Sequence, residues 1–271
     1  MFLMTRAISL FKSAQPVVAM IHAGALPGTP ASRHNLREIV AQAEREARLY
    51  RDAGVDGLLI ENMHDTPYMR GQVGPEIVAA MTVVVAAVKK AASLPTGLQI
   101  LAAANREALA VAHATGLDFI RAEGFVFAHV ADEGIIQSCA AELLRYRRAI
   151  GAEHIQIWAD VKKKHSAHAV TADVSIGETA YAVEFMRGDA VIVTGALTGD
   201  APRIGDIEAT KKATRLAVFL GSGVTAENVA ELRAQADGFI VGSDFKVGGH
   251  WAGAVDGRRV RRFLRAAREV R

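Results

Sequence analysis

Val218-Phe219-Leu220-Gly221-Ser222-Gly223 and Phe239-Ile240-Val241-Gly242-Ser243 each run from an apolar strand pattern straight into glycine and serine. Glycine lets the backbone approach an anion closely, and successive N–H groups at a strand-to-helix turn supply partial positive charge. In (β/α)8 barrels the loops after strands seven and eight bind phosphate in this way. The two segments therefore predict a phosphate site, provided that they are the last two strands of such a barrel.

The rest of the chain supplies the earlier strands, each followed by a helix pattern. Asn35 and Pro75 are expected to begin the first two helices, and Thr225 is expected to cap the amide of Asn228 at the start of the seventh. An unusually long connection follows the fourth strand. The earlier strands are predicted at residues 17–23, 57–62, 97–102, 119–123, 155–161 and 190–194, and the helices at 36–53, 77–92, 106–115, 140–150, 176–186, 207–214, from 225 onward, and at 257–270.

Alternating units of this kind favour a closed parallel barrel over an open doubly wound sheet. A dinucleotide-binding sheet would carry G-x-G-x-x-G after its first strand, whereas this chain has His22-Ala23-Gly24-Ala25-Leu26-Pro27-Gly28 there. We therefore predict an α/β fold, a single (β/α)8 TIM barrel spanning residues 1–271. Residues 1–16 are expected to cover the barrel floor rather than to act as a targeting peptide.

Composition excludes several classes of protein. The 271 residues carry a formal net charge of +3 and are 51% hydrophobic, which is enough for a sizeable core. The single cysteine, Cys139, excludes an internal disulfide and a cysteine-based metal site, and a cytoplasmic location is expected. The longest nearly apolar run, residues 77–88, is shorter than the ~20 residues that a membrane helix needs.

Arginines crowd the last predicted helix, at residues 258, 259, 261, 262, 265, 268 and 271. Val260, Phe263, Leu264 and Ala267 form an apolar stripe at helical spacing, so the arginines are interpreted as a solvated face. No RNA-stacking motif or zinc-finger spacing accompanies them, and a nucleic-acid partner is not expected. Peripheral contact with an acidic membrane surface stays open.

Polar side chains gather where the predicted strands end. In a barrel these ends and their loops share one mouth, which is where catalytic groups lie. The candidates are His22 after the first strand; Glu61, Asn62, His64 and Asp65 after the second; Arg121 and Glu123 on the fourth; Asp160, Lys162, Lys163, Lys164 and His165 after the fifth; and Thr194 and Thr198 after the sixth.

Arg121 and Glu123 are two residues apart and so share one face of their strand. On the helix-facing side both charges would be buried in an apolar layer, at a cost of several kcal/mol per unpaired ion, so they are expected to point into the mouth. There they either form an Arg–Glu pair that fills the upper barrel layer, or Arg121 binds an anion or hydroxyl that Glu123 orients.

The first two strand ends leave alternatives open. Glu61 and Asn62 are adjacent, so a regular strand turns only one of them inward. Asp65 either forms an Asx turn or takes part in chemistry. His22 is either a hydrogen-bonded structural residue or a catalytic one.

Asp160-Val161-Lys162-Lys163-Lys164-His165 is the densest chemical cluster of the chain. At least two of its lysines are expected to be solvated. A lysine directed into the mouth beside an acid can instead carry a proton, stabilise an oxyanion or act as a Schiff-base nucleophile. No cofactor is predicted, and a divalent metal on Asp160 with Glu61 or His22 stays open because no close ligand spacing demands one.

Phosphate is predicted to bind at Gly221, Ser222, Gly223, Gly242 and Ser243. The alternative is that these glycines only make tight turns. Lys246 follows closely and adds a cation where a phosphate or a second anionic group would bind.

Several segments are typical of one family: Met20-Ile21-His22 through Gly28; Glu61-Asn62 with Asp65 and Pro67; Asp160 with Lys164-His165; Thr194-Gly195 with Thr198-Gly199; Gly221 to Thr225; and Val241-Gly242-Ser243 with Lys246. Through them the chain resembles the BtpA (BtpA/SgcQ) family over nearly its whole length. The resemblance implies a ribulose-phosphate-binding type of barrel, whose members include isomerases, synthases and aldolases, and it adds Gly195 to the phosphate site. The chain departs from the family pattern at residues 246–251, which replace a more acidic stretch.

Three functions stay open. The leading one is an enzyme acting on a small phosphorylated sugar or nucleoside-like compound by lyase, isomerase or hydrolase chemistry. The resemblance also implies a non-enzymatic role in photosystem I biogenesis, and a barrel that binds a phosphorylated ligand without turnover is the third. A homo-oligomer is expected. The catalytic candidates are His22, Glu61, Asp65, Arg121, Glu123, Asp160, Lys164 and His165.

Overall fold

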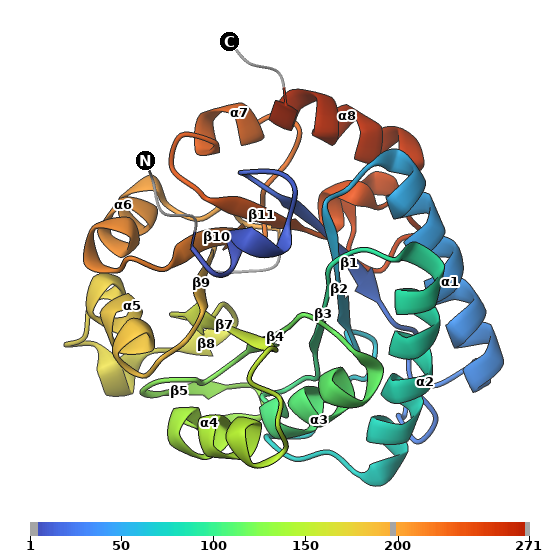
Figure 1. The fold of residues 1–271 in the computed structure, drawn as a ribbon, viewed down its shortest axis with the longest axis horizontal. Helices are drawn as coiled ribbons and strands as arrows, with labels where there is room; N and C mark the ends of the chain where they lie inside the picture. The colour runs from blue at the N-terminus through green and yellow to red at the C-terminus, as the bar shows by residue number, and fades with distance from the viewer. Residues whose placement is uncertain (1–4, 196–198, 269–271) are drawn as a thin grey trace.

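Eight parallel strands close into a barrel, with helices around its outside (Figure 1). The structure is a computed structural model that describes residues 5–195 and 199–268, so the predicted Thr198 and the end of the last helix beyond Arg268 lie outside it. The order around the barrel is β1-β11-β10-β9-β7-β4-β3-β2, which confirms the predicted fold. The barrel strands are β1 (Val17–His22), β2 (Gly57–Glu61), β3 (Thr96–Gln99), β4 (Phe119–Ala122), β7 (Gln156–Val161), β9 (Ala190–Thr194), β10 (Ala217–Gly221) and β11 (Gly238–Val241).

The outer helices begin where the sequence supplies the right caps. Asn35 and Glu38 form a reciprocal capping box at the start of α1, and Pro75 occupies the first turn of α2. None of the helices within residues 5–195 and 199–268 is long and apolar enough to cross a membrane. The helices are α1 (Leu36–Ala53), α2 (Pro75–Ala92), α3 (Asn105–Thr115), α4 (Ala140–Ala149), α5 (Ile176–Phe185), α6 (Ile204–Ala213), α7 (Val229–Leu232) and α8 (Gly257–Arg268).

The lower barrel interior is filled by a stack of aromatic rings. Trp158 lies between Phe119 and Phe219, with ring centroids 3.8 and 4.2 Å apart. Glycines on neighbouring strands make room for these rings, since a Cβ on Gly97 would lie 2.2 Å from Phe119 and one on Gly238 would lie 2.4 Å from Phe219. The lower barrel is thus a packed core and not a pore.

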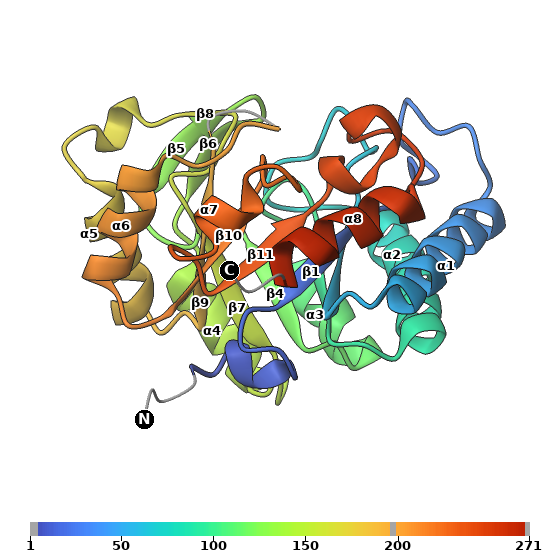
Figure 2. The same cartoon turned by 90° about the horizontal axis from the view of Figure 1, so that it is seen from above.

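The N-terminal segment closes the floor of this core. Its short 3-10 helix η1 (Ile8–Leu10) and Phe11 pack onto the barrel interior, and the rings of Phe11 and Trp158 lie 6.1 Å apart. Figure 2 shows this segment at the opposite end of the barrel from strands β5, β6 and β8. From residue 5 onward, where the structure describes it, the segment covers the floor as expected.

The loops on the other end contain structure that the sequence did not indicate. The long connection after β4 forms a hairpin of β5 (Ala128–Ala131) and β6 (Gly134–Gln137), and β8 (Ser166–Ala167) joins it in a small sheet of order β6-β5-β8. This sheet lies beside the barrel mouth (Figure 2). Further 3-10 turns are η2 (Ala169–Thr171), η3 (Ser243–Phe245) and η4 (Val247–Gly249).

The start of the seventh helix differs from the prediction. Helix α7 begins only at Val229, and the cap runs in the other direction: the side-chain oxygen of Asn228 accepts the Thr225 N–H at 2.8 Å. The Thr225 hydroxyl instead accepts the N–H of Glu227 at 3.2 Å. Both bonds tighten the turn after β10, which is one wall of the site.

Candidate functional site

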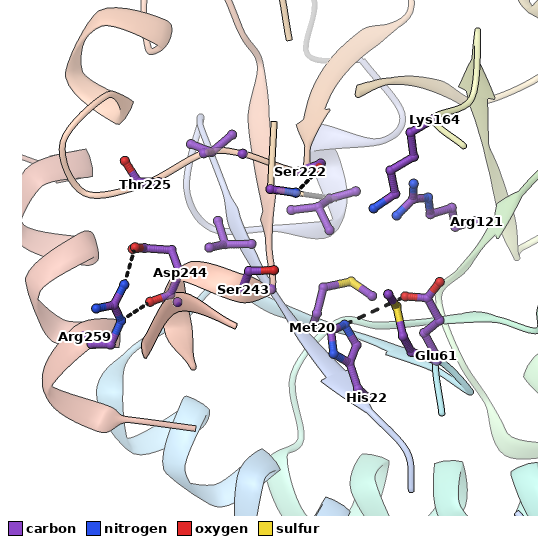
Figure 3. A pocket seen from close by; sticks show the side chains of 18 of the residues that line it. Met20, His22, Glu61, Arg121, Lys164, Ser222, Thr225, Ser243, Asp244 and Arg259 are labelled. Atoms are coloured by element: carbon purple, nitrogen blue, oxygen red, sulfur yellow. Dashed lines mark hydrogen bonds and ion pairs between the residues drawn. The ribbon is translucent and has the colours of Figure 1, made fainter. Parts of the chain in front are cut away.

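A cavity of about 260 Å³ opens at the carboxyl ends of the barrel strands (Figure 3). One side is formed by the loops after β10 and β11, residues 222–225 and 242–244. The other side carries His22 from β1, Glu61 from β2, Arg121 from β4 and Lys164 from the loop after β7. The predicted phosphate loops and four of the predicted catalytic residues therefore share one cavity.

The loop after β10 presents backbone donors to the cavity. Ser222 and Gly223 both have positive φ, 80° and 63°, and a Cβ on Gly223 would lie 2.1 Å from the backbone of Asp200, so no side chain fits there. Within the described part of the chain, the N–H groups of Gly223 and Val224 donate to no other group. These two donors can bind an anion.

The loop after β11 forms the opposite edge of this anion site. Gly242 lies close to the side chains of the first strand, since a Cβ there would lie 3.4 Å from Met20 and 3.5 Å from the His22 ring. The N-terminal turn of η3 follows at Ser243 and lines the same cavity. Together the two loops bracket a space lined by small residues, by Glu227, and by Asp244, which pairs with Arg259.

Arg259 belongs to this end of the cavity, although the sequence placed it among solvent-facing arginines. It donates from Nε to the Asp244 carbonyl oxygen at 2.6 Å and from a terminal nitrogen to the Asp244 carboxylate at 2.8 Å. The helix after the last strand of a barrel starts at the mouth, and an arginine in its first turn could have been recognised from that position.

Lys246 and Gly195 do not line the cavity. The predicted anion-binding role of Lys246 is wrong for this structure: the side chain is 2% exposed, and its Nζ pairs with Oε2 of Glu46 on α1 at 3.2 Å. The chain turns after η3, which directs this lysine between the barrel and α1. Gly195 lies under its own loop, with the Asp200 carbonyl oxygen 2.2 Å from where its Cβ would be.

His22 is held as a neutral imidazole. Its Nδ1 lies 3.0 Å from the carbonyl oxygen of Trp251, which can only accept, so Nδ1 carries the proton. Burial, with the positive charge of Lys246, lowers the pKa of His22 to about 3. The Nε2 lone pair therefore faces the cavity and lies 3.9 Å from Oε2 of Glu61 (Figure 3).

Glu61 is the complementary acid. Burial raises its pKa, against the opposing charge of Arg121, so the protonated carboxyl is favoured relative to an exposed glutamate. Neutral His22 can accept a proton from a substrate atom, and protonated Glu61 can donate one, which are the two roles that general acid–base catalysis requires.

Asn62 and Asp65 connect loops instead of entering this cavity. Asn62 donates to Asp65 Oδ2 at 2.9 Å and accepts the Leu101 N–H at 2.8 Å. The other oxygen of Asp65 accepts the Leu26 N–H at 2.7 Å. Asp65 lines a separate hollow between the first two loops, so the structure does not bring it to the other candidates.

Arg121 pairs with Asp160, and not with Glu123. Its Nε and a terminal nitrogen donate to the two Asp160 oxygens at 3.0 and 2.8 Å, and both side chains are buried. Glu123 accepts instead from Gln99 at 3.0 Å and pairs with Lys163 at 3.3 Å. Asp160 therefore orients Arg121, whose guanidinium faces the cavity.

The lysine cluster is more buried than expected. Lys162 donates to the Thr171 carbonyl oxygen at 2.9 Å and Lys163 pairs with Glu123, so the expectation that two lysines are solvated is wrong. Lys164 lines the cavity beside Arg121, and burial, with the Arg121 charge, lowers its pKa (Figure 3). His165 is displaced to a neighbouring cavity, also at the mouth.

A metal site is not assembled by these groups. Within residues 5–195 and 199–268, no three His, Cys, Asp or Glu side chains are arranged to hold a metal ion. Both oxygens of Asp160, the central residue of the suggested metal site, accept from Arg121. The arrangement thus places the backbone N–H groups of Gly223 and Val224 in one cavity with His22, Glu61 and the cations Arg121 and Lys164.

The model of the BtpA family matches residues 13–269. The chain belongs to the BtpA family. An uncharacterised mitochondrial protein of Caenorhabditis elegans is 49% identical over 263 residues, which cover 94% of each chain. The photosystem I biogenesis protein BtpA of Synechocystis is 35% identical and is matched over 96% of this chain and 90% of its own.

Solved structures share the barrel fold with this BtpA-family chain. Tryptophan synthase of Mycobacterium tuberculosis has a TM-score of 0.60 at 14% identity, over 95% of this chain and 94% of that one. Geranylgeranylglyceryl phosphate synthase of Thermoplasma acidophilum, solved with sn-glycerol-1-phosphate, has a TM-score of 0.60 at 14% identity, over 96% and 95%. At these identities the similarity concerns the fold alone.

Proposed function

We propose that this BtpA-family barrel is an enzyme acting on a small phosphorylated sugar or nucleoside-like compound. The phosphate binds between the loops after β10 and β11, where Gly223 and Val224 offer backbone N–H groups. The reacting carbon lies over His22 and Glu61. The observation that carries this proposal is the single cavity that joins the two loops to the acid–base pair.

The chemistry follows from the protonation states. Neutral His22 can accept a proton at Nε2, and Glu61 can deliver one, because burial shifts their pKa values in opposite directions. Arg121 and Lys164 lie on the same side of the cavity and can stabilise an oxyanion that forms on a carbonyl or hydroxyl. The lowered pKa of Lys164 also suits a Schiff base with a carbonyl substrate.

The structural neighbours support a phosphorylated ligand. They include a thiamine phosphate pyrophosphorylase, a phosphoribosylanthranilate isomerase and the synthase solved with sn-glycerol-1-phosphate. A phosphate site at the same two loops is a general property of many such barrels.

A charge placed in the anion site tests the proposal. Gly242→Asp adds a carboxylate at a position where a Cβ meets only ordinary contacts, at 3.4 Å or more. Binding of glycerol 1-phosphate, measured by isothermal titration calorimetry, should weaken by at least about tenfold because like charges repel. Gly205→Asp, at an open position on α6, adds the same charge outside the cavity and should bind as the wild type does.

Equal affinities of the Gly242→Asp variant and the wild type would overturn the phosphate site. Turnover is then followed by phosphorus NMR on a panel of phosphorylated sugars. A ligand that binds tightly and is recovered unchanged would favour binding without turnover over enzymatic activity.

A second candidate function comes from the Synechocystis relative, whose name assigns it to photosystem I biogenesis. A non-enzymatic assembly role would not need the acid–base pair. A Synechocystis strain lacking its own BtpA should be complemented with wild-type chain and with a Glu61→Gln, Lys164→Met variant. Rescue by both would favour the assembly role, whereas rescue by the wild type alone would favour the enzyme.

A further inference from the structure

A second cavity, of about 90 Å³, continues the site on the side away from the phosphate loops. It shares Glu61, Met63, Arg121 and Lys164 with the first cavity, so one ligand can occupy both. Its other walls come from the end of β3, the residues after β4 and β7, the β2–α2 loop and the tip of the β5–β6 hairpin.

The tip of the hairpin contributes Asp132 and Glu133 to this cavity. Their position is consistent with the electrostatics of Tyr68, whose pKa is raised by burial and further by the charges of Glu61 and Glu133. Next to the tip, a Cβ on Gly134 would lie 3.1 Å from the Arg70 guanidinium, so the hairpin closes against the β2–α2 loop. The hairpin thus forms a wall of the site instead of a free surface loop.

In this wall the side-chain oxygen of Gln99 is a hydrogen-bond acceptor that receives no hydrogen bond from the residues that the structure describes. The side chain is 1% exposed, and its amide nitrogen donates to Glu123 Oε1 at 3.0 Å. Glu123 is already well supplied, with Lys163 at 3.3 Å and the Ala103 N–H at 3.0 Å. No described residue donates to Gln99 Oε1, and the same holds for Oε2 of Glu133. Buried acceptors of this kind normally receive a hydrogen bond.

The charges around the cavity decide which donor suits it. Four acidic side chains, Glu61, Glu123, Asp132 and Glu133, share this cavity with the cations Arg121, Lys163 and Lys164. Since Glu123 pairs with Lys163, and Arg121 is paired with Asp160, neither sign is in large excess. A neutral group with several O–H donors satisfies the unpaired acceptors without adding a charge, whereas a second anion would meet the carboxylates.

We propose that this second cavity is a subsite for the hydroxyl-bearing end of the substrate, recognised by Gln99 and by Glu133 on the hairpin. The inference rests on the proposed function and narrows its substrate class to a phosphorylated polyhydroxy compound. Phosphate occupies one end, the reacting carbon lies over Glu61, and the remaining hydroxyls reach the hairpin.

Calorimetric titration with four probes tests the subsite: inorganic phosphate, glycerol 1-phosphate, ribose 5-phosphate and 2-aminoethyl phosphate. The wild type should bind ribose 5-phosphate about tenfold or more tightly than inorganic phosphate. Glu133→Ala, at the hairpin tip, and Gln99→Leu should each remove most of that gain and leave the affinity for inorganic phosphate unchanged. Glu208→Ala, at an exposed position on α6, is the matched control and should change neither affinity.

The outcomes separate this inference from the proposed function. If ribose 5-phosphate binds no more tightly than inorganic phosphate, and Glu133→Ala changes neither affinity, the subsite is overturned and the phosphate site stands. Preference for 2-aminoethyl phosphate over ribose 5-phosphate overturns the hydroxyl class. Failure of every phosphate compound to bind overturns the proposed function and the subsite with it.

Discussion

At the barrel mouth, burial and one close partner determine the protonation state or the orientation of each side chain. His22 is neutral because it is buried and because Trp251 accepts its Nδ1 proton. Both oxygens of Asp160 accept from Arg121, so this carboxylate orients the guanidinium. Asp160 therefore acts through Arg121, whereas His22 faces the cavity itself. The first is tested through its coupling to Arg121, and the second through the pH dependence of stability.

The His22 imidazole should make the protein less stable in acid. Its folded-state pKa of about 3 lies below the ordinary 6.5, so the unfolded chain takes up this proton first as the pH falls. Stability is lost from about pH 6.5 downward, by about 3 kcal/mol near pH 4.5. The free energy of urea unfolding of His22→Asn should fall less steeply over this range than that of the wild type. The exposed His34→Asn variant should follow the wild type, and identical slopes for His22→Asn and wild type would contradict the prediction.

The Arg121–Asp160 pair should be strongly coupled. Asp160→Asn leaves the Arg121 guanidinium buried without its counter-charge, which should lower the free energy of unfolding by about 3–5 kcal/mol. Adding Arg121→Met to Asp160→Asn should restore part of that loss in a double-mutant cycle. Glu44→Gln, in the exposed pair with Arg48, should cost less than about 1 kcal/mol. Strictly additive losses at 121 and 160 would show that the two side chains do not interact.

At the scale of elements, one short segment covers the floor of the barrel and another forms part of the wall of its mouth. The N-terminal η1 segment covers the aromatic stack at the floor, and the β5–β6 hairpin forms part of the wall of the mouth. Both elements are short and obtain their order from the barrel against which they pack.

Removal of the floor contact should destabilise the whole barrel. Phe11 is 6% exposed and its ring lies against Trp158, so Phe11→Ala should lower the free energy of unfolding by about 3 kcal/mol or more. Phe185→Ala removes the same ring from a position that is 72% exposed and should cost less than about 0.5 kcal/mol. Chemical denaturation of the two variants checks the comparison. Similar losses would mean that the segment does not seal the floor.

At the scale of the whole molecule, the distribution of charge bears on membrane contact. The arginines of α8 are largely paired with carboxylates: Arg258 with Asp256, Arg259 with Asp244, Arg262 with Glu227, and Arg268 with Asp56. The formal net charge of the chain is only +3. Pairing of this kind reduces the attraction of a helix to anionic lipid.

Binding to anionic vesicles should therefore be weak at physiological salt. In co-sedimentation with vesicles of phosphatidylcholine and phosphatidylserine, most of the wild-type protein should stay in the supernatant. Arg261→Glu with Arg265→Glu should change little. Strong sedimentation that this double variant abolishes would show that α8 is a membrane-binding face.

Much of the fold could be predicted because each barrel strand is buried on both faces and reads as a short apolar run. The hairpin at residues 128–137 was missed, since its strands are short and half exposed. At the site, the rule that strand ends share a mouth found His22, Glu61, Arg121 and Lys164. The rule failed for Lys246, because the position of a residue after a strand does not determine where its side chain points, and this one pairs with Glu46 on α1.

The sequence by itself determined the barrel, the two glycine-rich loops at its mouth and the set of ionisable groups that surround them, because periodicity and glycine placement act locally along the chain. Only the tertiary structure decided the partners: Arg121 with Asp160 across 39 positions, Lys246 with Glu46 across 200, and Gln99 with Glu123 across 24. The physical reason is that pairing and burial depend on which side chains the closed barrel brings within a few ångströms. Those same contacts set the pKa values and leave the acceptors of the second cavity for a ligand.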